Sequence, residues 1–330
     1  MSSVQTLKVE PSEDGSRLDR WFKRRFPHVS AVMVQKLCRK GQIRVDGGRV
    51  KGDSRVAAGQ EIRVPPLPEP DEKPKRAGLS PEDVDYVRSL VIYEDDELIA
   101  FNKPAGLAVQ GGSKTTRHLD GLLDAFGTGI DRPRLVHRLD KDTSGVLIVG
   151  KGPKATARLA RAFQSHRTKK TYWAIALGVP KPKRGEIKGF LKKAAGAGAD
   201  AERETMVGAS HGEAGASHAL TRYAVVAEAG QKASWVALRP VTGRTHQLRV
   251  HLAAMGNAIL GDRKYTCDRP APEDLDRRLC LHARRLEIPR DKGAPLVIKA
   301  DLPKPLKKIF DTLGFSEKEI DEALIEDELE

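Results

Sequence analysis

The first 64 residues carry a helical pattern of hydrophobic positions that gives way to a strand pattern. Apolar residues spaced three or four apart predict a first helix, at Leu18, Trp21, Phe22 and Phe26. A second helix is predicted over residues 31–40, because Ser30 can cap its start and Gly41 can end it. Alternating residues at 42–45 and 61–64 predict a small sheet. The pattern is that of a small α/β domain.

A proline-rich, charged segment follows this first region. Prolines favour extended backbone and remove hydrogen-bond donors, so the segment is expected to be a semi-stiff spacer. We therefore divide the chain into a first domain at residues 1–64, a linker at 65–89, a second domain at 90–312 and a tail at 313–330.

The second domain mixes strand and helix patterns without a repeating order. Strands are predicted at residues 91–93, 98–101, 146–149, 171–177, 220–226 and 234–238. Helices are predicted at residues 154–164 and 246–255. Because the order is not a repeating strand-helix-strand unit, the pattern favours an α+β fold with a mixed, largely antiparallel sheet.

Two segments lie outside this pattern. Residues 189–217 are rich in glycine and alanine and are expected to form a loosely structured insertion. The acidic tail has Ser316 and Glu319 at capping-box spacing, which predicts a solubilising terminal helix that could also dock on basic surface.

Charge and cysteine content narrow the functional classes. The chain has 58 Lys and Arg against 45 Asp and Glu, and a net charge of +13 favours a polyanionic partner such as nucleic acid. Its 3 cysteines form no cluster with histidine, so no metal site is expected. With no secretory signal and no apolar run of about 20 residues, we expect a cytoplasmic protein that contacts no membrane, and a monomer is our default.

The basic residues of the first domain lie along its predicted helices and hairpin. Two short helices followed by a hairpin resemble the S4 RNA-binding domain. The resemblance implies that this domain binds RNA, although a solvated basic face would give the same pattern. The candidate RNA-binding residues are Lys23, Arg39, Lys40 and Arg44.

Residues 134–145 place many charged side chains in an apolar frame immediately before a predicted strand. The sequence RLVHRLDKDTSG is too apolar for a surface loop and too polar for a core strand, which indicates a site held at a sheet edge. Two further motifs follow, KKTYWA at residues 169–174 and TGRTHQLRVHL at 242–252.

These three motifs, in this order, resemble the signature of the RluA-type pseudouridine synthases. The segments NKPAGL at residues 102–107 and LHA at 281–283 resemble further parts of that family. The resemblance implies isomerisation of selected uridines in structured RNA, with Asp140 as the catalytic residue. It also assigns catalytic roles to Tyr172 and Arg249.

Uridine isomerisation breaks one glycosidic bond and forms a carbon–carbon bond without losing an atom, so no cofactor is expected. Asp140 must be ionised, and it could act as nucleophile or as base at the ribose. The resemblance pairs it with an arginine, which we assign to Arg249, with Arg244 as the alternative or as a phosphate contact. Tyr172 is expected to stack on the base and could assist deprotonation, although a core role is open.

Other residues of the motifs have more than one interpretation. Arg138 could bind an RNA phosphate or form an ion pair within the loop. We group His137 with the substrate-binding residues, and an orienting role in the loop is favoured for its ring. His246 and His251 lie on different faces of the predicted helix, which argues against a shared metal.

The S4-like domain favours 23S ribosomal RNA as the substrate, because it resembles the longer members of the family. A synthase acting on transfer RNA is an alternative. A second alternative is a non-catalytic RNA-binding or ribosome-assembly protein, which would need only the basic first domain. A kinase-like reading of HRLD at residues 137–140 is disfavoured, because no glycine-rich phosphate loop accompanies it.

Overall fold

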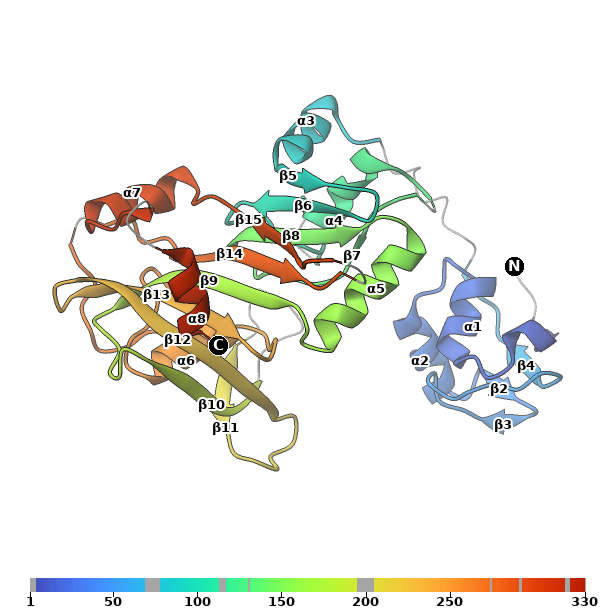
Figure 1. Cartoon of the computed structure of the whole chain (residues 1–330). Coiled ribbons are helices and arrows are strands. Elements are labelled where there is room, and N and C mark those ends of the chain that lie inside the picture. The colour runs from blue at the N-terminus through green and yellow to red at the C-terminus, as the bar shows by residue number, and fades with distance from the viewer. Residues whose placement is uncertain are drawn as a thin grey trace. The chain divides into compact units, whose positions relative to one another are not determined.

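The computed structural model divides the chain into two compact units, Met1–Gly78 (unit 1) and Leu79–Glu330 (unit 2). It describes residues 4–68, 78–112, 117–129, 131–194, 205–273, 275–290, 293–317 and 321–329. The boundary lies ahead of helix α3 (Pro81–Ser89), which belongs to unit 2, so the linker predicted to reach residue 89 ends earlier (Figure 1). Ser80 caps α3 and a proline opens it, a helix start that our linker assignment overlooked.

Unit 1 contains the two predicted helices and a four-stranded sheet in the order β1-β4-β2-β3. The elements are β1 (Gln5–Lys8), α1 (Leu18–Arg25), α2 (Ala31–Arg39), β2 (Arg44–Val45), β3 (Gly48–Arg49) and β4 (Glu61–Val64), with a 3-10 turn η1 (Pro11–Glu13). Ser30 caps α2 as predicted, accepting from the Met33 amide at 3.2 Å. Trp21 and Phe22 are fully buried in its core.

Unit 2 is built on an 11-stranded sheet in the order β11-β10-β12-β13-β9-β14-β8-β6-β5, with β15 beside β14 and β7 beside β8. Its strands are β5 (Val91–Glu94), β6 (Leu98–Lys103), β7 (Arg134–Leu135), β8 (Ser144–Gly150), β9 (Lys169–Leu177), β10 (Arg184–Lys193), β11 (Met206–Ala209), β12 (Ser217–Ala229), β13 (Ala233–Pro240), β14 (Leu281–Ile288) and β15 (Leu296–Lys299). Only the pairing of β8 with β14 is parallel among these described strands. The predicted mixed, largely antiparallel α+β fold is confirmed.

The helices of unit 2 cover the sheet. They are α3, α4 (Leu119–Leu122) with the 3-10 turn η2 (Leu123–Phe126), α5 (Gly152–Gln164), α6 (Gln247–Ala254), α7 (Lys304–Thr312) and α8 (Glu322–Glu328). Helix α6 packs against β11, β12 and β13, and α8 packs against β12. The predicted helices at 154–164 and 246–255 correspond to α5 and α6.

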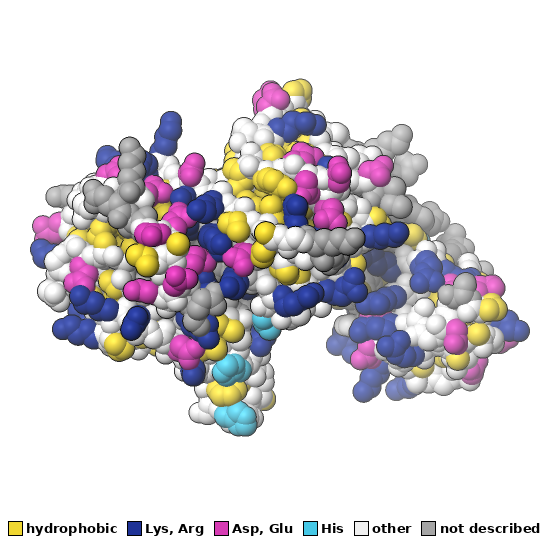
Figure 2. All heavy atoms as spheres, viewed as in Figure 1, with side chains coloured by type: hydrophobic (Ala, Val, Ile, Leu, Met, Phe, Trp, Pro, Cys, Tyr) yellow, Lys and Arg dark blue, Asp and Glu magenta, His cyan; other side chains and the backbone are white. Residues whose placement is uncertain are grey.

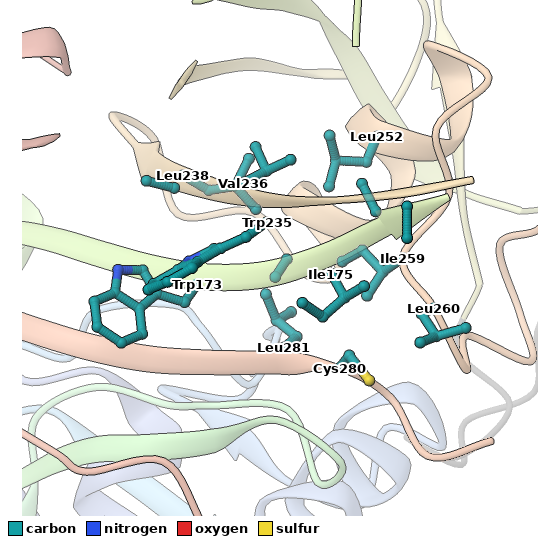
Figure 3. Packing of buried hydrophobic residues seen from close by; sticks show 14 of the residues in the cluster. Trp173, Ile175, Trp235, Val236, Leu238, Leu252, Ile259, Leu260, Cys280 and Leu281 are labelled. Carbon is teal, nitrogen blue, oxygen red and sulfur yellow. The ribbon is translucent and has the colours of Figure 1, made fainter. Parts of the chain in front are cut away.

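The largest apolar cluster of unit 2 fixes the central strands. Trp173 of β9 and Trp235 of β13 meet edge to face, with ring centroids 4.6 Å apart (Figure 3). Phe310 of α7 packs on Trp235 at 4.9 Å. From α6, Leu252 joins the same cluster. Burying several aromatic rings here holds β9 and β13 rigidly, which matters because both strands lead into the motif segments.

The structure decides two expectations about the periphery, and the first of them was wrong. Residues 189–217 include the end of β10, all of β11 and the start of β12, so the described part of the predicted loose insertion is ordered sheet. For the tail helix α8, the alternative of docking on basic surface holds, because Ile325 and Leu329 are buried in the core and Glu326 accepts from Arg239 and Arg285. Asp321 caps it; the predicted capping partner Glu319 lies outside the described residues.

Candidate active site

The first and second motifs meet where three strands lie side by side. Ala283 of β14 pairs with Gly145 of β8 on one side and with Tyr172 of β9 on the other. The loop that carries Asp140 runs directly into β8. The register of the sheet therefore brings Asp140 and Tyr172, 32 positions apart in sequence, to the same place.

A cavity of about 570 Å³ opens at this junction. It is lined by residues of all three motifs and of α5, including His137, Arg138, Asp140, Phe163, Gln164, Lys170, Tyr172, Gly243, Arg244, His246 and Arg249. Its volume falls within the ~300–1,000 Å³ typical of ligand pockets. The structure thus brings the three motifs together around one cavity.

The loop before β8 is fixed by close backbone contacts. Gly145 has a φ of +113°, and a Cβ there would lie 2.2 Å from the Ala283 carbonyl oxygen. Lys103 is fully buried and its Nζ donates to the carbonyl oxygens of Pro104, Leu107 and Lys141, each at 2.9 Å. Three carbonyls match the three donors of an ammonium group. The residue that follows Asp140 is thereby held in place.

Burial lowers the pKa of Lys103 to about 7, and the charges of Asp142 and Asp140 oppose that shift. Sequence reasoning assigned no role to Lys103 beyond the motif that contains it. Its position shows a structural role in supporting the loop of Asp140.

Arg249 lies between two carboxylates. Its Nε and Nη2 donate to the two oxygens of Asp262, both at 2.7 Å, and its Nη1 lies 3.9 Å from Oδ2 of Asp140. Burial opposes the charge of Arg249, but the hydrogen bonds and charge of Asp262 outweigh burial and raise its pKa. The bidentate pairing is therefore with Asp262, and Asp140 receives the remaining edge of the guanidinium.

Asp262 was not found from the sequence, because it belongs to none of the motifs. Its side chain is 0% exposed, and it also accepts from the backbone amides of Lys264 and Tyr265. Tyr265 stacks under the Arg249 guanidinium, 5.1 Å from the ring centroid. Together these residues fix Arg249 in one orientation, with one side facing Asp140.

His246 forms a second contact to Asp140 that sequence reasoning missed. Its Nε2 lies 4.0 Å from Oδ2 of Asp140, and its Nδ1 lies 2.7 Å from the Tyr265 hydroxyl. That hydroxyl accepts from the Met206 amide at 2.9 Å, so its own proton is free to go to Nδ1. This arrangement leaves the imidazole proton on Nε2, pointing at the carboxylate.

The loop of the third motif is braced by Gln247. Its Oε1 accepts from the Thr242 hydroxyl at 2.7 Å and from the Arg244 amide at 3.1 Å. Its Nε2 donates to the Leu220 carbonyl and to the Thr221 hydroxyl on β12. His246, with a φ of +52°, then turns the chain into α6. The backbone of residues 242–247 is therefore rigid where it borders the cavity.

Tyr172 and His137 are both uncharged in this setting. Burial, with a contribution from the charge of Asp140, raises the pKa of Tyr172 well above its usual range. Burial lowers the pKa of His137 to about 3, and its Nε2 accepts from the Ile148 amide at 3.0 Å. The His137 ring stacks on Phe163 with centroids 4.3 Å apart. The favoured orienting role of His137 in the loop agrees with these contacts.

The remaining predicted residues lie at the surface. Arg138 and Arg244 line the cavity with exposed side chains, and Arg244 donates to the His218 carbonyl at 3.0 Å. No ion pair to Arg138 occurs among the described residues. The candidate RNA-binding residues of unit 1 are also all exposed, namely Lys23, Arg39, Lys40 and Arg44.

Within the described ranges, no group of three or more His, Cys, Asp or Glu side chains could hold a metal ion. None of the helices described is both long enough and apolar enough to span a bilayer.

Two protein families match this chain. The family described as RNA pseudouridylate synthase matches residues 97–254, and the S4 domain matches residues 16–62. The chain is 32% identical to the ribosomal large subunit pseudouridine synthase C of Rickettsia bellii, over 89% of this chain and 97% of that protein. The protein of the same name from Vibrio vulnificus is also 32% identical, over 96% and 98%.

A solved structure gives the same assignment. Human RNA pseudouridylate synthase domain containing 4 superposes with a TM-score of 0.58 at 27% identity, covering 71% of this chain and 97% of that chain. The chain therefore belongs to the RNA pseudouridine synthase family and is an RNA-modifying isomerase with an N-terminal S4 domain.

Proposed function

We propose that this enzyme converts specific uridines of large-subunit (23S) ribosomal RNA to pseudouridine, with Asp140 as the catalytic carboxylate and without a cofactor. The observation that carries the proposal is the position of Asp140 in the cavity, within 4.0 Å of both Arg249 and His246. The relatives named as ribosomal large subunit enzymes support the substrate class. A cytoplasmic monomer is part of the proposal.

The chemistry is balanced within the nucleotide. The bond from N1 to C1′ breaks, C5 bonds to C1′, C5 loses a proton and N1 gains one. Asp140 acts at the ribose, either as a nucleophile on C1′ or as a base. In both roles it must be anionic, and the flanking Arg249 guanidinium and the Nε2 proton of His246 stabilise that charge.

Tyr172 faces the same cavity and is proposed to pack against the uracil ring. Because its pKa is raised, its hydroxyl stays protonated and is a poor acceptor for the C5 proton. The stacking role is therefore the one that we assign.

Reaching the cavity requires the uridine to leave its stack, which costs a few kcal/mol. Backbone contacts must compensate, and we assign them to unit 1 and to Arg138 and Arg244. Figure 2 shows Lys and Arg side chains gathered over one side of unit 1. Residues 1–64 are proposed as the RNA-binding domain and residues 90–312 as the catalytic domain.

Carbodiimide primer-extension mapping of unmodified 23S RNA tests this function. Wild-type enzyme should produce new stops at defined uridines, and Asp140→Asn should produce none while still binding the RNA. Transfer RNA forms a parallel arm, and stops there alone would replace the ribosomal substrate. Binding without stops on either RNA would favour a non-catalytic protein.

A further inference from the structure

The cavity has more positive than negative side chains. Four cations line it, Arg138, Lys170, Arg244 and Arg249, against the single lining carboxylate of Asp140. Arg249 is neutralised from behind by Asp262. The exposed Arg138 and Arg244 are solvated. Of these four cations, Lys170 alone has neither a carboxylate partner among the described residues nor an exposed side chain.

Lys170 reaches the cavity from strand β9. It lies two positions before Tyr172, so both side chains project from the same face of the sheet. Its side chain is half-buried, and its Nζ lies 3.9 Å from the point where a Cβ on Gly243 would be. The ammonium group therefore lies beside the loop of the third motif, where that loop borders the cavity.

No described residue supplies Lys170 with a counter-charge. The His137 imidazole, on which the charge of Lys170 acts, is neutral. Phe163 and Gln164, which line the same cavity, carry no charge. Burial lowers the pKa of Lys170, and no carboxylate acts against this effect. A half-buried ammonium loses part of its hydration, and without a carboxylate partner this loss carries a free-energy cost in the free enzyme. Such a cost is expected where an anionic ligand completes the site.

We propose that the Lys170 ammonium binds a phosphate of the RNA backbone directly 5′ or 3′ to the extruded uridine. This inference rests on the proposed function. RNA carries one anionic phosphate per linkage, and a lysine ammonium serves as a compact charge for phosphate. With the ribose at Asp140, a flanking phosphate is the nearest anion that the substrate can bring. Lys170 would then position the nucleotide, whereas Asp140 carries out the chemistry.

The test uses short RNAs around a mapped target uridine, in which the phosphate 5′ or 3′ to it is replaced by a neutral methylphosphonate. Wild type, Lys170→Met, Lys170→Arg and the neighbouring Lys169→Met are compared by kcat/KM. Lys170→Met should lose about 10- to 100-fold on the natural RNA, the size of a charge-assisted hydrogen bond. Lys170→Arg should recover part of this loss, and Lys169→Met should match wild type.

The deciding result is whether the effects of the Lys170 substitution and of the phosphate substitution are additive. Methylphosphonate at one of the two linkages should lower kcat/KM of the wild type by about 10- to 100-fold. The same RNA should lower kcat/KM of Lys170→Met almost no further. Equal losses for both proteins at both linkages would overturn the proposal, as would wild-type activity of Lys170→Met. Thermal melting of Lys170→Met distinguishes a role in RNA binding from a role in stability. Because the substitution removes an unpaired charge, it should not lower the Tm. An inactive wild-type enzyme would instead refute the proposed function.

Discussion

The cations on the two faces of the sheet around strand β9 differ in whether they are paired with carboxylates. On one face, Lys170 and Tyr172 line the cavity with Asp140 as its single lining carboxylate. On the other face, Thr171 donates to Glu326 of α8 at 2.6 Å, and Arg239 of the neighbouring β13 and Arg285 of the neighbouring β14 donate to the same carboxylate at 2.5 and 2.8 Å. The first face leaves positive charge uncompensated, whereas the second neutralises it.

This difference assigns ligand binding to one face of the sheet around β9 and the docking of a helix to the other. Arg239 and Arg285 hold α8 on the sheet, and Glu326 neutralises their charge, so they are not expected to bind RNA. Arg138, Lys170 and Arg244 line the cavity without a carboxylate partner among the described residues, so they remain available for an anionic ligand. We therefore expect the ion-pair partner of each basic residue, and not only the number of basic residues, to distinguish RNA contacts from structural contacts.

The largest effect on folding is expected from Asp262→Asn. It leaves the buried Arg249 charge without its main partner, which should lower the unfolding free energy by about 3–5 kcal/mol. Urea unfolding measures this. The control is Asp276→Asn, whose Arg278 pair is 47% and 44% exposed and should cost at most ~1 kcal/mol. Equal costs for both variants would contradict the central role of Asp262.

A smaller effect is expected from Glu326→Gln on the opposite face. Losing charged hydrogen bonds to Arg239 and Arg285 should cost ~1–3 kcal/mol in unfolding free energy and leave the rate of pseudouridine formation unchanged. The exposed Glu328→Gln on the same helix is the matched control, with a change within ~0.5 kcal/mol. A slowed reaction in folded Glu326→Gln would show that the two faces are not independent.

Acid should destabilise unit 2 through its buried histidines. Burial is the main cause that lowers the pKa of His137 to about 3, and of His251 and His282 to about 4. The unfolded chain takes up these protons near pH 6.5 while the folded chain does not, so stability should fall as pH drops from 6.5 towards 4.

The urea midpoint measured from pH 7.5 to 5 checks this expectation. His282 bridges Ser144 on β8 and the Ala300 carbonyl, at 2.9 and 3.0 Å. Replacing it in His282→Gln should flatten the pH dependence. A midpoint that stays constant over this range would disprove the assignment.

The smallest effects are expected in unit 1. Lys23→Met or Lys40→Met should each weaken RNA binding modestly and reduce the slope of log K against log salt by about 1. The control is Arg25→Met, because Arg25 is held by Glu13 at 2.9 Å and should affect the melting of unit 1 instead. Unchanged salt slopes for both lysine variants would remove these residues from the RNA interface.

The alternation of apolar and polar residues predicted the fold class, and the resemblance of the three motifs identified residues that line the cavity. Asp140 lies in the loop before β8, Tyr172 on β9 and Arg249 on α6.

Strand β14 was not predicted, because Arg284 and Arg285 interrupt its alternation of apolar and polar residues at a bulge. Their acidic partners, Glu322 and Glu326 of α8, come close only in the folded protein. Strand β10 was not predicted either, because its glycines have a low propensity for strands. In the folded protein its pairing with β12 outweighs that propensity. Asp262 could not be predicted, because its role depends on a tertiary contact.

The most direct measurement is the single-turnover rate of pseudouridine formation by Asp140→Asn, with Glu326→Gln as the carboxylate control from the opposite face. We expect Asp140→Asn to melt and bind RNA like wild type, yet to react at least ~100-fold more slowly, the smallest loss expected for a general base. Glu326→Gln should react at the wild-type rate and melt at a lower temperature. Wild-type conversion by Asp140→Asn would contradict the central claim.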